Sequence, residues 1–225
     1  MRTHGRKNGF VTQGQEQRLT HCLPKIGLPV GKHLDDSGFS PSLPVVMEIG
    51  FGNGDFLVHL AKTHVTWQLL GIEIYLPGVA KAVGRLDDAG VLPRCRISQT
   101  PAQVVLSQQI SAEHLHGIYI NHPDPWPKKR HHKRRLIQQD FATLMVSRLK
   151  VGGFIRLATD KPDLAIWMQK ILDHTAGLEN TAGVGGFIVR DDDRPFTKFE
   201  QRGLKEGRDS EFLHYIKVKN VQQLP

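Results

Sequence analysis

The sequence predicts an α/β protein with a mostly parallel central sheet that helices flank on both sides. Short, almost continuously apolar segments recur along the chain, from residues 45–49 to residues 154–158. Longer amphipathic segments separate them, as in repeated strand-helix units. Strands without polar alternation are typical of a parallel sheet whose two faces are both covered. These two observations give the fold class.

Hydrophobic periodicity predicts the individual elements. The segment 45–49 reads Val-Val-Met-Glu-Ile, which has the length and apolar content of a buried strand. Further strands are expected at 69–74, 118–121 and 154–158. The intervening segments carry apolar residues three or four positions apart, which is the spacing of one helix face. Helices are expected at 55–63, 77–89, 102–109, 133–149 and 162–174.

The two ends of the chain differ from this central pattern. Residues 212–218 alternate after a glycine-marked turn, which predicts an antiparallel C-terminal hairpin within 197–218 at the sheet edge. Residues 1–44 are polar, basic and lack a sustained period, which predicts an extended or mobile arm. We therefore expect an arm over 1–44 and one domain over 45–225. Arm cations that can add to a nucleic-acid surface are Arg2, Arg6, Lys7 and Arg18.

Composition narrows the class of partner. Thirty Lys and Arg residues against 22 Asp and Glu residues give a net charge of +8, which favours nucleic acid over a neutral metabolite. Cys22 and Cys95 lie in no metal or redox motif, which indicates a reducing compartment. No segment approaches the ~20 apolar residues that span a bilayer, and no apolar signal core follows Met1. We expect a cytoplasmic protein without a membrane partner.

A glycine-rich turn at residues 50–54 follows the first expected strand and opens a helix. Glycines such as Gly50 and Gly52 permit a tight turn and close approach of a ligand to the backbone. Glu48 precedes the turn, and Glu73 ends the next strand, where an acid typically accepts hydrogen bonds from ribose. An acid before the turn suits an ammonium group better than a pyrophosphate. The pattern favours S-adenosylmethionine over NAD, with a turn that binds no ligand as the structural alternative.

A carboxylate between two prolines marks a second candidate site, in Pro123-Asp124-Pro125-Trp126. Proline fixes its own φ and restricts the residue before it, so Asp124 is expected at a well-defined angle. The indole of Trp126 offers a surface on which a nucleobase can stack, although it is equally suited to a core.

The residues after this motif form a dense run of cations. Lys and Arg neutralise phosphates, and Arg binds them in a bidentate manner, so the run predicts RNA contact. Its alternative is the solvated face of a helix. Neither Cys nor a paired acid completes a tetrahedral site around the two histidines of the run, so no metal is expected. The expected RNA-binding residues are Arg130, His131, His132, Lys133, Arg134 and Arg135.

Five segments together, in their order and spacing, resemble the bacterial tRNA (guanine-N7-)-methyltransferase family. They are residues 48–54, 71–73, 123–135, 158–160 and 197–203. The Pro-Asp-Pro-Trp motif with its basic run and the Thr-Lys-Phe-Glu motif are the specific parts, whereas the glycine turn indicates only a class I methyltransferase. The resemblance implies a Rossmann-like class I methyltransferase fold. It also implies methyl transfer from S-adenosylmethionine to N7 of a guanosine in the tRNA variable loop.

Residue roles follow from the resemblance alone. Glu48 would lie near the methionine part of the cofactor, Glu73 on its ribose, and Asp124 at the active site beside the cofactor. Pro101 departs from the family, which usually has Asp or Asn near the adenine, so Gln99 or Thr100 would have to supply that contact. The implied cofactor residues are Glu48, Gly50, Gly52, Glu73, Thr100 and Asp124. The implied substrate residues are Lys128, Asp160, Thr197, Lys198, Phe199 and Glu200.

The expected chemistry needs no general base, because guanine N7 carries a lone pair and no proton. Catalysis then depends on orientation and on a carboxylate, Asp124 or Asp160, near the cationic product. Asp124 could equally bind the guanine edge or the cofactor ammonium. Purely structural roles are a helix cap for Asp160 and an ion pair between Glu200 and Arg202.

Two other functions compete with this one. An amino methyltransferase of adenine or cytosine has consecutive prolines in the equivalent loop, which this chain lacks. A nonenzymatic RNA-binding module on the same fold is disfavoured by the intact acidic and glycine positions. The role of His122, where many family members have an aromatic residue or serine, stays open. The expected partner is tRNA, with no obligate protein partner and a monomer or homodimer as the assembly.

Overall fold

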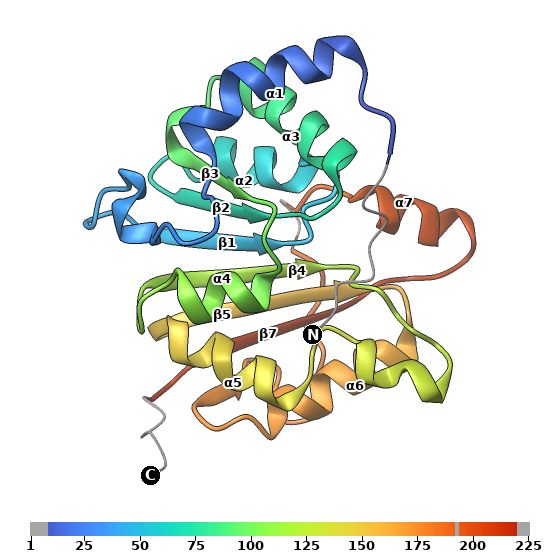
Figure 1. Ribbon diagram of the computed structural model, residues 1–225. Coiled ribbons are helices and arrows are strands. Elements are labelled where there is room, and N and C mark those ends of the chain that lie inside the picture. Colours follow the sequence, from blue (N-terminus) through green and yellow to red (C-terminus); the bar gives the residue numbers. More distant parts are fainter. Residues whose placement is uncertain (1–8, 192–193, 220–225) are drawn as a thin grey trace. The chain divides into compact units, whose positions relative to one another are not determined.

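Two contiguous units make up the chain, and each contains its own strands and helices. The computed structural model describes residues 9–191 and 194–219. One unit comprises residues 1–111 and the other residues 112–225. In Figure 1 the colours of the first unit run from blue to green, and those of the second from green to red. Neither is a small appendage, because the two are almost equal in length.

The first unit contains a parallel sheet in the order β3-β2-β1. β1 (Val45–Ile49) and β2 (Gln68–Ile72) are buried at every position, and β3 (Cys95–Ser98) forms the edge. In the register Ile49 pairs with Ile72, which pairs with Ser98. The carboxyl ends of the strands therefore lie side by side, at the edge where open parallel sheets bind ligands.

Three helices follow these strands in the chain. They are α2 (Asp55–Thr63), α3 (Leu76–Asp88) and α4 (Ala102–Gln108). Their buried residues are predominantly apolar, and they include Phe56 and Leu60 of α2 and Val79 and Val83 of α3. A buried leucine or valine of this kind contributes about 1.5–3 kcal/mol relative to an exposed one. The helices thus supply part of the core of the first unit.

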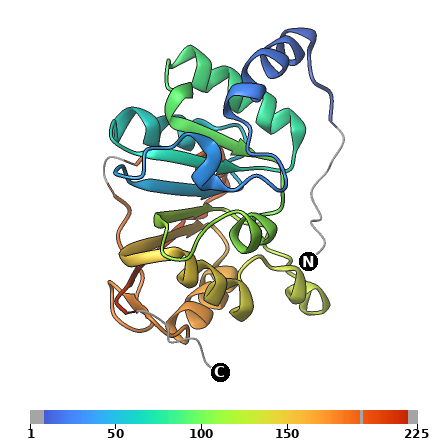
Figure 2. The same cartoon turned by 60° about the vertical axis from the view of Figure 1, so that its left-hand side comes forward.

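Helix α1 (Gln13–Ile26) precedes the sheet in sequence and packs against α3, as Figures 1 and 2 show in blue and green. A capping box begins it, because Thr12 and Gln15 exchange side-chain and backbone hydrogen bonds. Arg18 donates to Gly84 O at 3.1 Å and pairs with Asp88 at 2.9 Å. The extended conformation expected for this part of the arm is therefore wrong. Residues Arg2, Arg6 and Lys7 lie outside the described residues.

The second unit combines parallel and antiparallel pairing in the order β4-β5-β7-β6. β4 (Leu115–Asn121) and β5 (Leu149–Thr159) are parallel. β7 (Glu211–Lys217) runs antiparallel to β5 and to the short β6 (Leu178–Asn180). The expected antiparallel strand is confirmed. Its neighbours, however, come from 30 and more residues earlier in the chain.

Three α-helices and one 3-10 helix complete the described part of this unit. They are η3 (Lys129–Arg134), α5 (Gln139–Arg148), α6 (Pro162–Asp173) and α7 (Lys198–Lys205). Figure 1 shows α5 and α6 side by side. The Tyr215 hydroxyl donates to Asp173 Oδ1 at 2.6 Å, which fastens β7 to the end of α6.

The predicted α/β fold class is confirmed, with two corrections to its elements. The helix expected over 133–149 begins only at Gln139, because η3 occupies 129–134 and Arg135 has ψ 137°, which is not helical. Residues 198–205, expected within a hairpin, form α7. Arg96 interrupts the apolar pattern of β3, and β6 is only three residues long, which explains why neither strand was expected. The division into an arm of 1–44 and a domain of 45–225 stays a prediction.

Candidate active site

The glycine turn lies at the carboxyl edge of the first unit's sheet. Gly50, Gly52 and Gly54 have φ values of 76°, 57° and 80°, in the region that residues with a Cβ rarely adopt. The Gly50 amide donates to Ile72 O at 2.7 Å. The turn is thereby anchored to the end of the neighbouring strand β2.

Glu73 fixes the same turn through its side chain. Its Oε2 accepts a hydrogen bond from the Gly52 amide at 3.0 Å. Its Oε1 accepts from the amides of Ile74 and Tyr75 at 2.8 and 2.9 Å. Each carboxylate oxygen has about two acceptor positions, so Oε2 retains capacity for a further donor such as a ribose hydroxyl.

Two of the glycines leave the backbone open, and two others allow close packing. A Cβ on Gly50 or Gly52 would meet no protein atom within 4 Å, so a ligand can approach the turn there. A Cβ on Gly54 would lie 2.5 Å from Ala82 Cβ, and one on Gly78 would lie 2.6 Å from Gly52 O. The start of α3 therefore supports the turn from one side. This arrangement fits a small organic cofactor.

The remaining predicted cofactor residues of this unit lie at the same sheet edge. Glu48 is 2 % exposed within β1 and pairs in register with Gly71. Its burial in β1, two residues before Gly50, places an acidic side chain directly before the glycine turn and makes Glu48 a functional candidate. Thr100 is buried just beyond β3, and its amide donates to Ser98 Oγ at 3.2 Å. Pro101 is the N-cap residue of α4 and makes no side-chain capping hydrogen bond, because proline has no side-chain acceptor.

The loop that carries Asp124 is held between two residues with unusual backbone geometry. His122 has φ 49° and Trp126 has φ 43°, although neither is glycine. Such conformations cost about 1–3 kcal/mol each and cluster at functional sites. The Asp124 side chain between them is exposed, and within the described part of this unit no hydrogen bond or ion pair engages it. Its carboxylate is therefore available to a ligand.

The basic run extends from this loop through η3 and is largely exposed. Lys128, Arg130 and Lys133 are exposed, as the RNA-contact prediction requires. Arg134 lies over the Trp126 ring with its Cζ 5.0 Å from the ring centroid, and His131 meets the same ring edge-on at 5.9 Å. Trp126 thus packs against the run that follows it.

Arg135 departs from the predicted RNA-binding role, because its side chain is 1 % exposed. Its Nε donates to Pro125 O at 2.9 Å, and its Nη2 bonds Asp163 in α6. The guanidinium also lies over the Trp167 ring at 5.1 Å. Arg135 therefore ties the Asp124 loop to α6 and has no free face for phosphate. His132 likewise packs edge-on against Trp167 at 5.4 Å.

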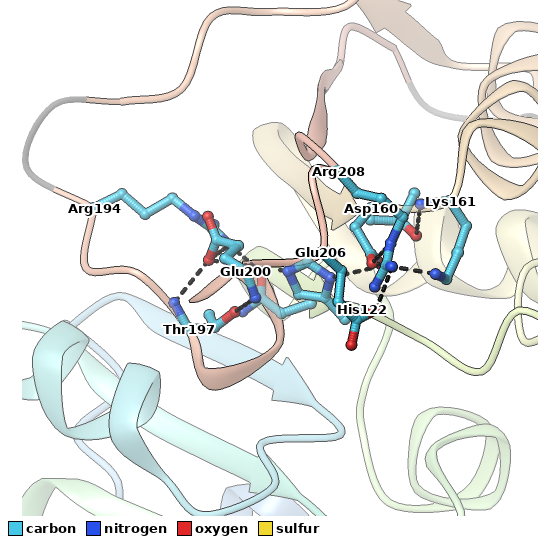
Figure 3. A network of polar contacts seen from close by, with 10 residues as sticks. His122, Asp160, Lys161, Arg194, Thr197, Glu200, Glu206 and Arg208 are labelled. Atoms are coloured by element: carbon cyan, nitrogen blue, oxygen red, sulfur yellow. Dashed lines mark hydrogen bonds and ion pairs between the residues drawn. The ribbon is translucent and has the colours of Figure 1, made fainter. Parts of the chain in front are cut away.

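A polar network surrounds the other predicted substrate residues, as Figure 3 shows. Arg208 Nε donates to Asp160 Oδ2 at 2.7 Å, and Lys161 Nζ lies 3.3 Å from the same oxygen. Burial raises the pKa of Asp160, but these two cations outweigh it and hold the pKa below its usual value. Asp160 does not cap α6 in the described structure, since Lys161 occupies that position.

Glu200 is the most deeply buried member of this network, at 2 % exposure. Its carboxylate lies 3.5 Å from both Arg190 Nε and Arg194 Nη2. Burial raises its pKa, whereas contacts with His122, Arg194 and Thr197 lower it to about 2. The expected alternative pairing with Arg202 is wrong, because Arg202 pairs with Glu206 at 2.9 Å.

A capping box places the Thr-Lys-Phe-Glu motif at the start of α7. The Glu200 amide donates to Thr197 Oγ1 at 3.2 Å, and the Thr197 amide donates to Glu200 Oε2 at 2.8 Å. This leaves Lys198 and Phe199 exposed on the first turn, with 57 % of Phe199 accessible. Thr197 and Glu200 of the motif therefore cap the helix, whereas Lys198 and Phe199 are accessible at the surface.

Sequence patterns assign no role to Arg190, Arg194 or Arg208, and they leave the role of His122 open. Arg208 is 48 positions from its partner Asp160, and no local motif marks the loop residues Arg190 and Arg194 as partners of Glu200. Among the described residues no group of three His, Cys, Asp or Glu side chains is placed to hold a metal ion. In the same part of the chain no helix has the length and apolar character needed to cross a membrane.

Comparison with solved structures identifies the fold. The chain resembles geranyl diphosphate C-methyltransferase from Streptomyces coelicolor with a TM-score of 0.53 and 10 % identity, over 91 % of this chain and 75 % of the other. It resembles a mutant 16S rRNA (adenine(1408)-N(1))-methyltransferase from Catenulisporales acidiphilia with a TM-score of 0.52 and 10 % identity, over 81 % and 88 %. At these identities the likeness shows the methyltransferase fold alone.

Comparison of sequences identifies the family. A family model described as "Putative methyltransferase" matches residues 42–213. The tRNA (guanine-N(7)-)-methyltransferase of Alkalilimnicola ehrlichii is 41 % identical over 96 % of this chain and 92 % of its own length. That of Nitrosomonas eutropha is 39 % identical over 97 % of both chains. The chain therefore belongs to the tRNA (guanine-N(7)-)-methyltransferase family and is an enzyme of the methyltransferase class.

Proposed function

We propose that this protein transfers a methyl group from S-adenosylmethionine to N7 of a guanosine in the variable loop of tRNA. The observation that carries the proposal is the exposed carboxylate of Asp124, held in a strained loop that continues into an exposed basic run. A single segment thus offers a charge for the base and cations for the phosphates.

The first unit supplies the cofactor residues other than Asp124. The Gly50–Gly52 backbone is open to a ligand, and Glu73 Oε2 can accept from a ribose hydroxyl while it holds the Gly52 amide. Glu48 provides a buried negative charge for the ammonium of the methionine moiety. When bound, S-adenosylmethionine supplies an electrophilic methyl group, which guanine N7 accepts with its lone pair. Thr100, rather than Pro101, offers a hydroxyl near the adenine.

Asp124 is the better of the two carboxylates for stabilising the charge that develops on the base. Asp160 is already neutralised by Arg208 and Lys161, so its field at a ligand is weak. Asp124 has no such partner within the described part of its unit. A carboxylate aimed at a developing positive charge contributes most when it needs no reorganisation, which the two flanking prolines ensure.

Lys128, Arg130, Lys133, Lys198 and the accessible ring of Phe199 supply the tRNA contacts in this proposal. Lys and Arg contribute salt-dependent affinity without sequence information, and an exposed aromatic ring can stack on an unpaired base. Arg135 contributes indirectly, because it positions the loop. A tRNA substrate also agrees with the cytoplasmic location expected from the sequence.

The test uses methyl-labelled S-adenosylmethionine and two unmodified tRNA transcripts that differ only at the variable-loop guanosine, which one of them replaces with adenosine. Label on the guanosine transcript alone, at a site cleaved by chemistry specific for 7-methylguanosine, is the expected result. Label on both transcripts, or stable to that chemistry, would assign a different target. Binding of tRNA and cofactor without transfer would favour a binding role and contradict the proposal.

A further inference from the structure

His122 lies between two carboxylates that belong to different elements. Its Nδ1 is 3.8 Å from Asp160 Oδ1, just beyond β5, and its Nε2 is 3.9 Å from Glu200 Oε2 in α7. The imidazole is 4 % exposed, so water does not screen either contact strongly. Figure 3 shows the ring between the two groups. One side chain at the end of β4 thus faces both predicted substrate elements.

A third contact connects His122 to the surface of α7. The Phe199 ring stacks on the imidazole at a centroid distance of 5.9 Å and an angle of 26°. Phe199 is the residue of the Thr-Lys-Phe-Glu motif with the most suitable surface for a base. Its orientation therefore depends on a ring that is itself fixed by the left-handed backbone of His122.

The remaining contacts of α7 leave a specific task for His122. Arg190 and Arg194 hold Glu200 from the loop that precedes α7, and Arg208 holds Asp160 from the loop that follows it. Gly203 of α7 also approaches Asp160 closely, since a Cβ there would lie 3.3 Å from Asp160 Oδ2. Within the described network, His122 is the residue that contacts both carboxylates and Phe199.

We propose that His122 is a positioning residue that links Asp160 to α7 and thereby fixes the orientation of residues 197–200 for substrate binding. The relevance to guanosine rests on the proposed function, whereas the link itself is a property of the fold. Loss of the imidazole is expected to loosen the first turn of α7. Substrate binding would suffer, while the residues that the first unit contributes to the cofactor site, such as Glu48 and Glu73, would keep their positions.

The first measurement is hydrogen exchange of the full-length protein, followed in peptides that cover 198–205. His122→Phe keeps a ring that can stack on Phe199 but removes both nitrogens. We expect exchange in α7 to become about tenfold faster, with α2 of the first unit as an unchanged internal reference. His122→Gln places an amide near the position of Nε2 and is expected to restore protection. His116→Phe, which lies in β4 itself and outside the network, is the matched control.

Two further variants separate loss of the His122 contacts from backbone strain. Phenylalanine tolerates a positive φ poorly, so His122→Asn, which adopts that conformation more readily, tests the link without backbone strain. Asparagine is too short to reach Glu200, and α7 should again exchange faster. Gly203→Ala, which pushes α7 away from Asp160, shows how the same peptides respond when the docking is disturbed. Unchanged exchange in both His122→Phe and His122→Asn would overturn the proposal.

Kinetics separate this positioning role from the proposed activity. With the guanosine transcript, His122→Phe should raise the KM for tRNA about tenfold while kcat and the Kd for S-adenosylmethionine change less than about twofold. An equal loss of cofactor affinity would contradict the assignment. If the wild-type protein methylates neither transcript, the proposed function fails, and the exchange data still decide whether His122 positions α7.

Discussion

The Gly52 amide donates to the Glu73 carboxylate at 3.0 Å, so an acid that follows β2 determines the shape of the turn that follows β1. The two residues are 21 positions apart in the chain. Two further amides bind the other oxygen of the same carboxylate. Glu73 is thus oriented before any ligand arrives, which reduces the entropic cost of binding one.

Glu73→Gln should weaken S-adenosylmethionine binding by about tenfold or more, because its amide can present an N–H group where the Gly52 N–H needs an acceptor. Isothermal titration of wild type and variant measures the change. Glu179→Gln, an exposed residue of β6, is the control and should bind as wild type does. An unchanged Kd in Glu73→Gln would remove Glu73 from the cofactor site.

Gly78→Ala should lower both the midpoint of thermal unfolding and the cofactor affinity. The new Cβ would stand 2.6 Å from Gly52 O, which forces the glycine turn or the start of α3 to move. Gly14→Ala in α1 meets no atom within 4 Å and is expected to stabilise the protein slightly, by up to about 1 kcal/mol. Calorimetry measures the unfolding midpoint of both variants, and titration measures their cofactor affinity. The same result for Gly78→Ala and Gly14→Ala would refute the prediction.

Asp124→Asn should reduce kcat by about a hundredfold with little change in thermal stability, because the exposed carboxylate has no partner to lose within the described unit. Asp160→Asn should show the reverse, with a lower melting temperature from the loss of its contacts with Arg208 and Lys161. Single-turnover kinetics and thermal scans distinguish the two. A drop in stability for Asp124→Asn that accounts for its lost activity would assign it a structural role.

Arg130→Ala and Arg135→Ala should differ in kind although both lie in the basic run. Loss of exposed Arg130 is expected to weaken tRNA binding and to lower the salt slope by about 1, with unchanged stability. Loss of buried Arg135 leaves Pro125 O and Asp163 without their donor and should lower stability by about 2 kcal/mol or more. Filter binding at several salt concentrations and urea unfolding test this. If Arg135→Ala changes only the salt dependence of tRNA binding and leaves the unfolding free energy unchanged, the structural role of the buried guanidinium is contradicted.

Glu200→Gln should destabilise the protein in a pH-dependent way. The folded pKa of about 2 lies below the ordinary value of 4.5, so the stabilisation is fully present above pH 4.5 and is lost as pH falls toward 2. The difference in unfolding free energy between wild type and variant should be about 2–3 kcal/mol at pH 7 and should shrink between pH 5 and 2. Urea unfolding at several pH values measures it, and a constant difference would contradict the assigned pKa.

Local patterns were sufficient for most of the fold. The apolar run 45–49 is β1 from end to end, and helices α2, α4 and α6 begin where their periodicity begins. Elements that depend on tertiary contacts were missed. Helix α1 needs its packing on α3, and β6 needs β7. The sequence contains the capping-box signature at Thr197 and Glu200, which predicts the start of a helix. The hairpin expected over 197–218 includes these residues, although only its last part forms a strand.

The sequence predicts features of the candidate site that depend on a single segment. It does not predict contacts between residues of different segments. Asp124 is exposed, and so are Lys128, Arg130 and Lys133 of the basic run, which is the arrangement that the sequence favours. Arg135, by contrast, is identical in type to its neighbours, and only its position above Trp167 commits it to the interior. Glu200 belongs to a motif that is recognisable in the sequence, whereas its partners Arg190 and Arg194 come from a loop without a recognisable pattern.

The contiguity of the two units has a consequence for synthesis on the ribosome. All three strands and the glycine turn of the first unit lie within the first 111 residues, so their pairings can form while the rest of the chain is still being made. β5, in contrast, gains β7 as a partner only after residue 217 has emerged. The nascent enzyme can therefore assemble the glycine turn and its three strands long before the polar cluster around Glu200, and a chain truncated in translation would lack that cluster entirely.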